Sequence, residues 1–189
     1  MTQPTDPPGP AGPLAEQVRY LMERAAVSDT LFAFARAIDT RDWQAYANLF
    51  VEDGVLELPF RQPDGTSAGN VGRAGMAAYV QNGQSGFTQT HHLSANHQID
   101  GDTATTTSYC QCVHRHDQDA ANVWELGGWY HCELIRTADG WRFTRVRLEA
   151  VWEHGSPNPD RPSPVVTLAV PDGSARQTGA FQPQGQSSS

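Results

Sequence analysis

Four β-type runs in the second half of the chain constrain its fold more than any other feature. They cover about residues 88–99, 102–115, 123–137 and 141–152. The dipeptides Asp100-Gly101 and Asp139-Gly140 stand between the first two and the last two runs, and such dipeptides form tight turns between adjacent antiparallel strands. Gly127-Gly128 inside the third run predicts a bulge or a bend. This half of the chain therefore predicts a long antiparallel meander.

Helical periodicity precedes these strands. Apolar residues recur at helical spacing in two groups, first Leu14, Val18, Leu21 and Ala25, then Leu31, Phe34 and Ile38. Ser28 and Asp29 between the groups are favourable N-cap residues. The region is therefore either two helices or one helix that is kinked at this point.

Shorter elements separate this helical region from the meander. We expect a helix from Trp43 to Phe50 with Asp42 as its cap, a strand over Val55–Leu58 ended by Pro59, and a helix from Gly72 to Gln81. Helices followed by an antiparallel meander predict an α+β fold, in which the helices pack on the concave face of a cone-like curved antiparallel sheet. Such a cone encloses a pocket between the helix ends and the sheet.

The two ends of the chain differ in composition from the part between them. Residues 1–13 form a Pro-rich lead without the charged and apolar regions of a signal peptide, and residues 155–189 form a tail rich in Pro, Gly and Ser. We interpret both as disordered, with residues 14–154 as one domain, although Val165–Val170 is a candidate for one additional docked strand. The three cysteines form no even disulfide framework, so a reduced cytoplasm is expected.

Charge and hydropathy exclude several classes of partner. The net charge of −8 argues against binding to nucleic acid or to an anionic membrane. No apolar run approaches the roughly 18–20 residues that a membrane span needs. A small molecule is therefore the expected partner.

Most of the seven histidines lie between Thr88 and His116, on the first two β runs. Side chains alternate along a strand, so His92 shares a face with Ser94, while His91 and His97 lie on the other face. With a simple two-residue turn at Asp100-Gly101, His92 lies opposite Tyr109, Thr90 lies opposite Gln111, and His114 falls on the other face unless a bulge shifts the register. An inward-facing histidine is a ready general acid or base near neutral pH.

Asp39 lies at the end of the long helical region, on its apolar face, because it follows Ala35 by four residues and Leu31 by eight. A carboxylate in that position needs a partner, since an unpaired buried charge is costly. One hypothesis pairs it with Arg36 or makes it the cap of the next helix. The other places it beside a histidine, where it fixes the tautomer of the ring and raises its basicity.

A metal site is the competing interpretation of the histidines. His114 and His116 form an i, i+2 pair, and Asp117 or His131 would add a third ligand. Helical HExxH and paired CxxC signatures are absent from the sequence, so we expect no metal. The glycines between Gly69 and Gly75 lack phosphate-loop spacing and are interpreted as a loop leading into a helix.

Several strings resemble one family. They are Phe34-Ala35-Arg36-Ala37-Ile38-Asp39-Thr40-Arg41-Asp42-Trp43 with Leu49-Phe50, His91-His92-Leu93-Ser94-Ala95-Asn96, Asp100-Gly101-Asp102-Thr103-Ala104, and Gly127-Gly128-Trp129-Tyr130 through Asp139-Gly140-Trp141-Arg142-Phe143. Through them the chain resembles the SnoaL-like family of the nuclear transport factor 2-like superfamily, which includes scytalone dehydratase, bile acid dehydratases and polyketide cyclases.

The resemblance implies an α+β cone with an apolar pocket, acid–base chemistry without metal or cofactor, and a homodimer or homotrimer. It also implies that Asp39 and His92 form the pair seen in the dehydratases, with a second acid–base residue between Cys112 and His114. The tyrosines that polarise the substrate carbonyl in scytalone dehydratase have no clear match, since the helix position is Ile38.

The sequence therefore favours an enzyme, a dehydratase or a cyclase/isomerase acting on a small apolar carbonyl compound. His92 would remove a proton next to the carbonyl, Asp39 would orient it, and Tyr109, His114 or Tyr130 would bind the developing enolate. Two alternatives stay open. One is a non-catalytic ligand-binding or assembly module of the same fold, and the other is the small subunit of a ring-hydroxylating oxygenase.

Overall fold

The structure, a computed structural model, describes residues 12–61, 65–100, 104–116 and 123–157. Its elements are α1 (Leu14–Asp39), α2 (Trp43–Asn48), β1 (Phe50–Arg61), β2 (Ser67–Val71), α3 (Arg73–Gln84), β3 (Gln89–Asp100), β4 (Thr105–Arg115), β5 (Val123–Thr137) and β6 (Gly140–His154). Most of the expected lead and tail, including Val165–Val170, lies outside the described residues. None of the helices in the described ranges is long and apolar enough to cross a membrane.

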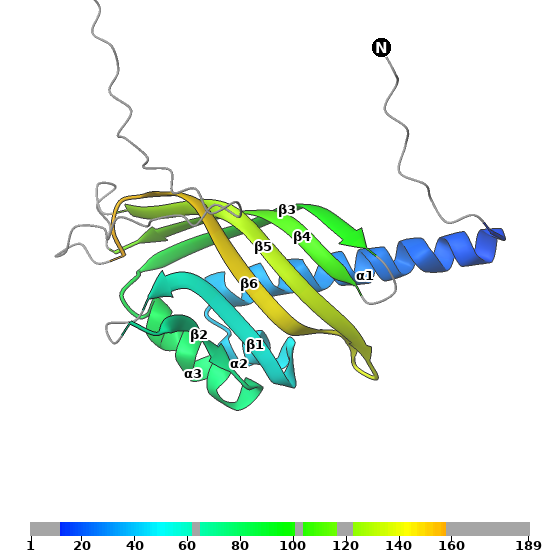
Figure 1. Cartoon of the computed structure of the whole chain (residues 1–189), viewed down its shortest axis with the longest axis horizontal. Helices are drawn as coiled ribbons and strands as arrows, with labels where there is room; N and C mark the ends of the chain where they lie inside the picture. The colour runs from blue at the N-terminus through cyan, green and yellow to red at the C-terminus, as the bar shows by residue number, and fades with distance from the viewer. Residues whose placement is uncertain (1–11, 62–64, 101–103, 117–122, 158–189) are drawn as a thin grey trace, which may run out of the picture.

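The six strands form one curved, unclosed sheet with the helices packed on one side, so the α+β prediction is confirmed (Figure 1). The strand order is β2-β1-β6-β5-β4-β3. The meander β3–β6 is antiparallel, and the bulge predicted at Gly127-Gly128 is present where β5 pairs with β6. The prediction of an antiparallel sheet is wrong for one pair of strands, because β1 and β6 run parallel. No hairpin joins these two strands, which are far apart in the chain, so nothing requires them to be antiparallel.

Residues 14–39 form one α-helix with Ser28 inside it, so the alternative of two separate helices is wrong. The first half of the chain departs from prediction in two further places. The first strand is not ended by Pro59, since β1 continues to Arg61. The ladder with β2 shifts register between Glu57 and Arg61, so Pro59, which has no N–H to donate, lies within an irregular stretch. The strand β2 was not predicted, because its sequence SAGNV has little β-type character.

The predicted short helix is confirmed as α2, with Asp42 as its cap. The Asp42 carboxylate accepts a hydrogen bond from the Ala45 N–H at 2.9 Å. The helix ends before Phe50, which begins β1. This cap sets the direction in which the chain leaves α1, three residues after Asp39.

Aromatic side chains fill the space between the helices and the sheet. Phe34 of α1 is central, with ring centroids 4.9 Å from Tyr46, 5.5 Å from Tyr130 and 5.5 Å from Phe143. All four side chains are buried. In this part of the cone the concave face of the sheet is packed with side chains rather than hollow.

The register of β3 and β4 differs from the predicted one. His92 pairs with Cys112, and Thr90 pairs with His114. Two causes combine: the connection is longer than two residues, since Asp100 pairs with Thr105, and a bulge lies between Ala95 and Gln98. Asn96 in this bulge has a φ of 54°, a left-handed conformation that asparagine tolerates better than most residues.

The bulge decides which face His114 and Tyr109 occupy. It shifts the pairing by one residue, and a shift of one residue exchanges the faces of a strand. His114 therefore lies on the inner face with His92, and both side chains are buried. Tyr109 lies on the outer face, half exposed, with its ring centroid 4.1 Å from that of Trp129.

Candidate active site

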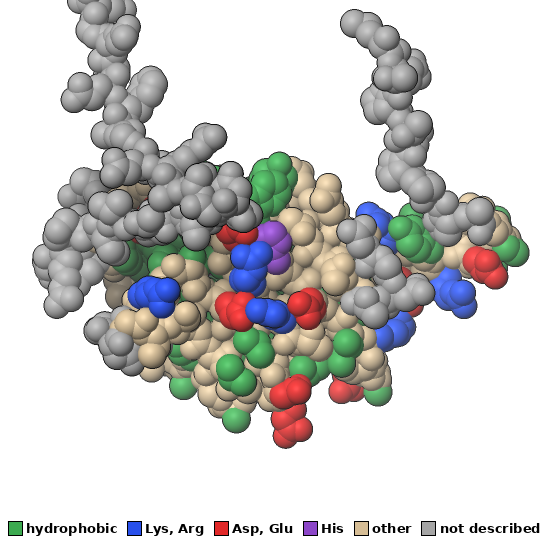
Figure 2. Space-filling model, viewed as in Figure 1, with side chains coloured by type: hydrophobic (Ala, Val, Ile, Leu, Met, Phe, Trp, Pro, Cys, Tyr) green, Lys and Arg blue, Asp and Glu red, His purple; other side chains and the backbone are tan. Residues whose placement is uncertain are grey.

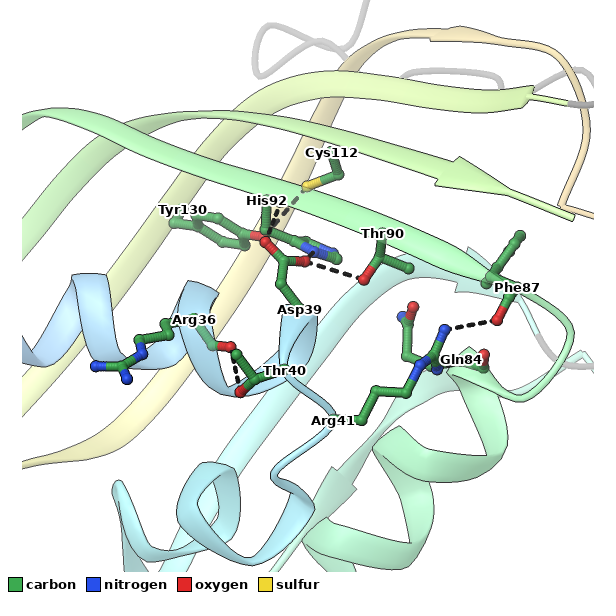
Figure 3. A network of polar contacts seen from close by, with 10 residues as sticks. All are labelled: Arg36, Asp39, Thr40, Arg41, Gln84, Phe87, Thr90, His92, Cys112 and Tyr130. Carbon is green, nitrogen blue, oxygen red and sulfur yellow. Dashed lines mark hydrogen bonds and ion pairs between the residues drawn. The ribbon is translucent and has the colours of Figure 1, made fainter. Parts of the chain in front are cut away.

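Asp39 is the last residue of α1, and its carboxylate accepts three hydrogen bonds from β3 (Figure 3). The ring Nδ1 of His92 lies 2.7 Å from Oδ1, and the Thr90 hydroxyl lies 3.0 Å from the same oxygen. The backbone N–H of His92 donates to Oδ2 at 2.8 Å. The alternative partner Arg36 points away from this carboxylate (Figure 3). Of the two sequence hypotheses for Asp39, the structure shows the contact with histidine.

The turn after α1 fixes the carboxylate in this position. Arg41 adopts a left-handed φ of 57°, and its N–H donates to the carbonyl of Ile38 at 3.0 Å. Its guanidinium donates to the carbonyls of Gln84 at 3.3 Å and Phe87 at 2.6 Å. The end of α1 is therefore tied both to β3, through Asp39, and to the segment that follows α3, through Arg41.

The hydrogen bonds determine the charge of Asp39. Burial by itself would raise the pKa of the Asp39 carboxyl, but the hydrogen bonds from the His92 ring and backbone, together with the Thr90 hydroxyl, hold that pKa below its ordinary value. The carboxylate is therefore ionised at neutral pH and acts as an acceptor. Nδ1 of His92 must then carry the proton, which leaves the lone pair on Nε2.

His114 lies beside the dyad of Asp39 and His92. Its ring stands edge-on to that of His92, with centroids 5.0 Å apart, and it packs against the rings of Phe87 and Trp124, which also stack on each other. Burial, together with the neighbouring His92, lowers the pKa of His114 to about 3. His114 is therefore a neutral imidazole at pH 7. Its Nδ1 atom is buried without a hydrogen-bond partner among the described residues.

Of the two tyrosine candidates, only Tyr130 lies near His92. Tyr130 is fully buried on β5, and its hydroxyl lies 3.4 Å from the Sγ of Cys112, which is the β4 neighbour of His92. Burial raises the pKa of the Tyr130 phenol well above its ordinary value. Tyr109 is on the opposite face of the sheet and does not join the other candidates.

Thr90 is the site residue that sequence reasoning placed in the register but gave no role. It shares a face with His92 by strand alternation, so its position two residues earlier was the available signal. Sequence reasoning gave Cys112 no contact with a site residue. Its contact with Tyr130 could not be found without the register between β3, β4 and β5.

The two other histidines of the metal interpretation, His116 and His131, have separate partners. The ring of His116 lies 3.2 Å from the Gly86 carbonyl and 3.0 Å from the Ser156 carbonyl. His131 contacts Glu149 at 3.0 Å, away from His114. In the described part of the chain, no three side chains of His, Cys, Asp or Glu are grouped as a metal ion would require, and Asp117 lies outside that part.

A surface hollow of about 370 Å³ adjoins the dyad on its Asp39 side. It is lined by Asp39, Arg41, Thr88, Gln89, Thr90, His91, Val113 and Arg115. The hollow is open to solvent and is not the enclosed pocket expected from the sequence. His92 is not among its lining residues, and only 5% of the His92 side chain is exposed, against 22% for Asp39. The carboxylate thus faces the solvent side, and the imidazole faces the interior.

Residues 19–147 match the sequence model of the SnoaL-like domain. The chain belongs to the SnoaL-like family. The matched range includes α1 from its second turn, the whole of β3 to β5, and all three residues Asp39, His92 and His114. The resemblance drawn from the sequence strings is therefore confirmed. No curated protein matches the chain.

Solved structures resemble this SnoaL-like protein over most of their own length. A provisionally assigned scytalone dehydratase from Novosphingobium aromaticivorans DSM 12444 is 23% identical with a TM-score of 0.63, over 72% of this chain and 89% of that one. A provisionally assigned aromatic ring hydroxylase from Novosphingobium aromaticivorans is 27% identical with a TM-score of 0.62, over 72% and 94%. The hexachlorocyclohexane dehydrochlorinase LinA-type3 from Novosphingobium barchaimii LL02 is 16% identical with a TM-score of 0.61, over 72% and 92%. At identities of 23% and 16%, the likeness to the dehydratase and to the dehydrochlorinase shows the shared fold alone.

Proposed function

We propose that this SnoaL-like protein is an acid–base enzyme without a cofactor, a dehydratase or cyclase that acts on a small apolar carbonyl compound. The contact between Asp39 Oδ1 and His92 Nδ1, at 2.7 Å, is the observation that supports this proposal most. A carboxylate bound to one ring nitrogen leaves the other as a base whose protonated form is stabilised. Burial strengthens this electrostatic stabilisation, because water screens the pair little.

In the proposed reaction, Nε2 of His92 removes the proton from the carbon next to the substrate carbonyl. The C–H electron pair moves toward the carbonyl, so that an enolate forms while His92 becomes an imidazolium paired with Asp39. In a dehydration, the imidazolium then gives its proton to the departing β-hydroxyl, which leaves as water, and His92 returns to its neutral form. In a cyclisation, the enolate carbon attacks a second carbonyl instead, and the imidazolium gives its proton to the alkoxide oxygen that forms there, which returns His92 to its neutral form.

His114 is proposed to bind the enolate oxygen. A neutral imidazole can donate one hydrogen bond without protonating the oxygen, and the low pKa of His114 keeps it neutral. Its buried Nδ1 lacks a partner among the described residues, which is costly unless a ligand atom fills that role. The rings of Phe87 and Trp124 around it suit an apolar substrate.

Binding requires an opening, because 5% exposure of the His92 side chain leaves Nε2 inaccessible to a substrate. We assign the opening to residues 85–88, which connect α3 to β3. Phe87 in this segment covers His114, with ring centroids 4.7 Å apart, and its carbonyl is held by Arg41. Displacement of this segment would join the surface hollow beside Asp39 to the inner side of His92.

The names of two similar structures are consistent with elimination chemistry. A dehydratase and a dehydrochlorinase both remove a proton and a leaving group, and one histidine base serves either reaction. A non-catalytic binding module is the second candidate, since the core beside the dyad is filled and His92 is almost fully covered.

A panel of β-hydroxy ketones and β-hydroxy thioesters tests the proposal, because loss of water creates a conjugated product that absorbs in the ultraviolet. We expect turnover of at least one compound by the wild-type chain and loss of this turnover, with binding retained, in His92→Gln. Binding that occurs without turnover in the wild type would favour the binding module.

A further inference from the structure

The surface hollow beside Asp39 has a charge opposite to that of the chain as a whole. The chain carries 21 acidic and 13 basic residues, for a net charge of −8. The eight residues that line the hollow include two arginines, Arg41 and Arg115, but only one carboxylate, that of Asp39. Composition therefore does not account for this basic lining, and its charge favours an anionic ligand.

A second hollow of similar size, about 360 Å³, has the opposite balance of charge. Its lining includes three carboxylates, those of Asp53, Glu57 and Glu133, and one arginine, Arg145. The Arg145 guanidinium is paired with Glu57 at 2.7 Å. On the face of the molecule in Figure 2, basic side chains likewise lie beside acidic ones. The second hollow thus offers no excess of positive charge to an anion.

Arg41 is fixed in the wall of the surface hollow by neutral groups. Its guanidinium donates to the carbonyls of Gln84 and Phe87 and lies over the Trp43 ring, 5.8 Å from the ring centroid. Carbonyl groups and aromatic rings position a guanidinium without cancelling its charge. A guanidinium also has more N–H donors than these two hydrogen bonds use, so Arg41 keeps donors for a further acceptor.

Arg115 completes the basic lining from the end of β4. It is half-buried, and its guanidinium donates to the side-chain oxygen of Gln89 at 3.4 Å. Its backbone carbonyl accepts hydrogen bonds from the Thr88 N–H at 2.7 Å and the Thr88 hydroxyl at 3.1 Å. Arg41 and Arg115 therefore both contact the segment that connects α3 to β3, and this segment brings two distant parts of the sequence to one hollow.

The single carboxylate of the hollow does not cancel the charge of the two arginines. Asp39 accepts its hydrogen bonds from His92 and Thr90, so its negative charge is directed toward β3. With His91 counted as neutral, about one positive charge remains in excess, which suits a monoanion better than a phosphate dianion. A carboxylate is planar and accepts two hydrogen bonds side by side, a geometry that guanidinium groups match.

We infer that the surface hollow binds a carboxylate group of the substrate, with Arg41 and Arg115 as its two guanidinium partners. The inference rests on the proposed function, because it concerns the substrate of the same dyad. A compound anchored here by its carboxylate places its other, apolar end at residues 85–88, next to the Phe87 ring that covers His114. The substrate class is then a β-hydroxy carbonyl compound with a carboxylate at the end remote from the reacting carbons.

Nuclear magnetic resonance titration of the full-length chain with benzoate and benzamide, at about 50 mM salt, tests the anion site without requiring turnover. The two probes share a shape and differ in charge. Benzoate should bind with roughly millimolar affinity and shift amide signals of the residues that line the hollow, and benzamide should not. Arg115→Gln should weaken benzoate binding by about tenfold or more, because charge-assisted hydrogen bonds are lost. The spectrum also reports whether this variant is folded.

Arg145→Gln is the matched control, because it removes the same charge from the second hollow, and it should bind benzoate like the wild type. Equal binding of benzoate and benzamide, or equal weakening in Arg115→Gln and Arg145→Gln, would overturn the inference. Tighter binding of inorganic phosphate than of benzoate would overturn the assignment to a carboxylate.

Kinetics on a β-hydroxy ketone that carries a carboxylate, and on its methyl ester, separates this inference from the proposed function. The wild type should prefer the acid, and Arg115→Gln should lower kcat/KM for the acid by about tenfold or more while affecting the ester less. Equal kcat/KM of the wild type for acid and ester would overturn the inference. Benzoate binding that needs Arg115, without turnover of either compound, would support the anion site and contradict the proposed function alone.

Discussion

The Asp39 carboxylate contacts His92 at two points. Its Oδ1 lies 2.7 Å from the ring Nδ1, and its Oδ2 accepts a hydrogen bond from the backbone N–H at 2.8 Å. The first contact selects the tautomer of the ring. The second satisfies a backbone donor of β3, which is an edge strand of the sheet. One carboxylate at the end of α1 thus fixes both the chemistry of the imidazole and the place of the strand that carries it.

Thr90 should support this arrangement without being essential to it. Thr90→Val keeps the shape of the side chain and removes the hydroxyl that donates to Asp39 Oδ1 at 3.0 Å. We expect the free energy of unfolding to fall by about 0.5–1.5 kcal/mol, and turnover to fall less than in Asp39→Asn. Urea denaturation and steady-state kinetics measure the two effects. Thr107→Val, also on this pair of strands, is the control, and a larger loss in the control would refute the role of Thr90.

His114 should make the stability of the protein depend on pH. The unfolded chain binds a proton at this residue near pH 6.5, whereas the buried ring does so only near pH 3. The unfolded state therefore gains a proton first as pH falls, and the free energy of unfolding decreases through that window, by up to about 1.4 kcal/mol per pH unit. Asp39 acts at lower pH, since its stabilisation is lost only as its own depressed pKa is approached.

Urea denaturation of wild type and His114→Gln at pH values from 5 to 7 isolates this contribution. The slope of unfolding free energy against pH should be smaller in the variant by up to about 1.4 kcal/mol per pH unit, which corresponds to one bound proton. An unchanged slope would mean that the His114 ring is protonated as readily in the folded state as in the unfolded chain.

Arg41 should control the opening over the dyad. Arg41→Leu removes the hydrogen bonds to the carbonyls of Gln84 and Phe87. It leaves intact the hydrogen bond from the Thr88 N–H to the Arg115 carbonyl, just before β3 begins. We expect hydrogen exchange of residues 85–88 to accelerate by about tenfold or more, because local opening becomes easier. Exchange in β5 and β6 should not change. Arg36→Leu, exposed one turn earlier on α1, is the matched control. Equal protection of residues 85–88 in both variants would contradict the assignment of the opening.

Local patterns in the sequence were sufficient for much of the fold. The limits of β5 and the cap at Asp42 agree with prediction, because alternation and capping depend on neighbouring residues alone. Asp39 was placed correctly on the inner side of α1 by its spacing from Ala35. Its contact with His92 joins positions 53 residues apart, and it was expected only because the sequence resembles a family that contains such a pair.

The register between β3 and β4 could not be predicted, because it depends on the length of the connection after Asp100 and on one bulge. Asparagine tolerates a left-handed conformation, but its presence at position 96 does not by itself locate a bulge, and this bulge moves His114 to the inner face and Tyr109 to the outer one. The filled core has a similar origin. Whether Phe34, Tyr46 and Phe143 line a pocket or close it depends on how deeply the rings interleave, which no periodicity reports.

Turnover of an identified substrate by Asp39→Asn, His92→Gln and the double variant tests the central claim most directly. If the two residues act as one unit, each single variant should lose most of the activity, with His92→Gln reduced by about 10²–10⁴-fold. The double variant should then be little worse than His92→Gln alone, because residues that act together are not additive. Near-wild-type turnover in His92→Gln, or fully additive losses in the double variant, would contradict the account.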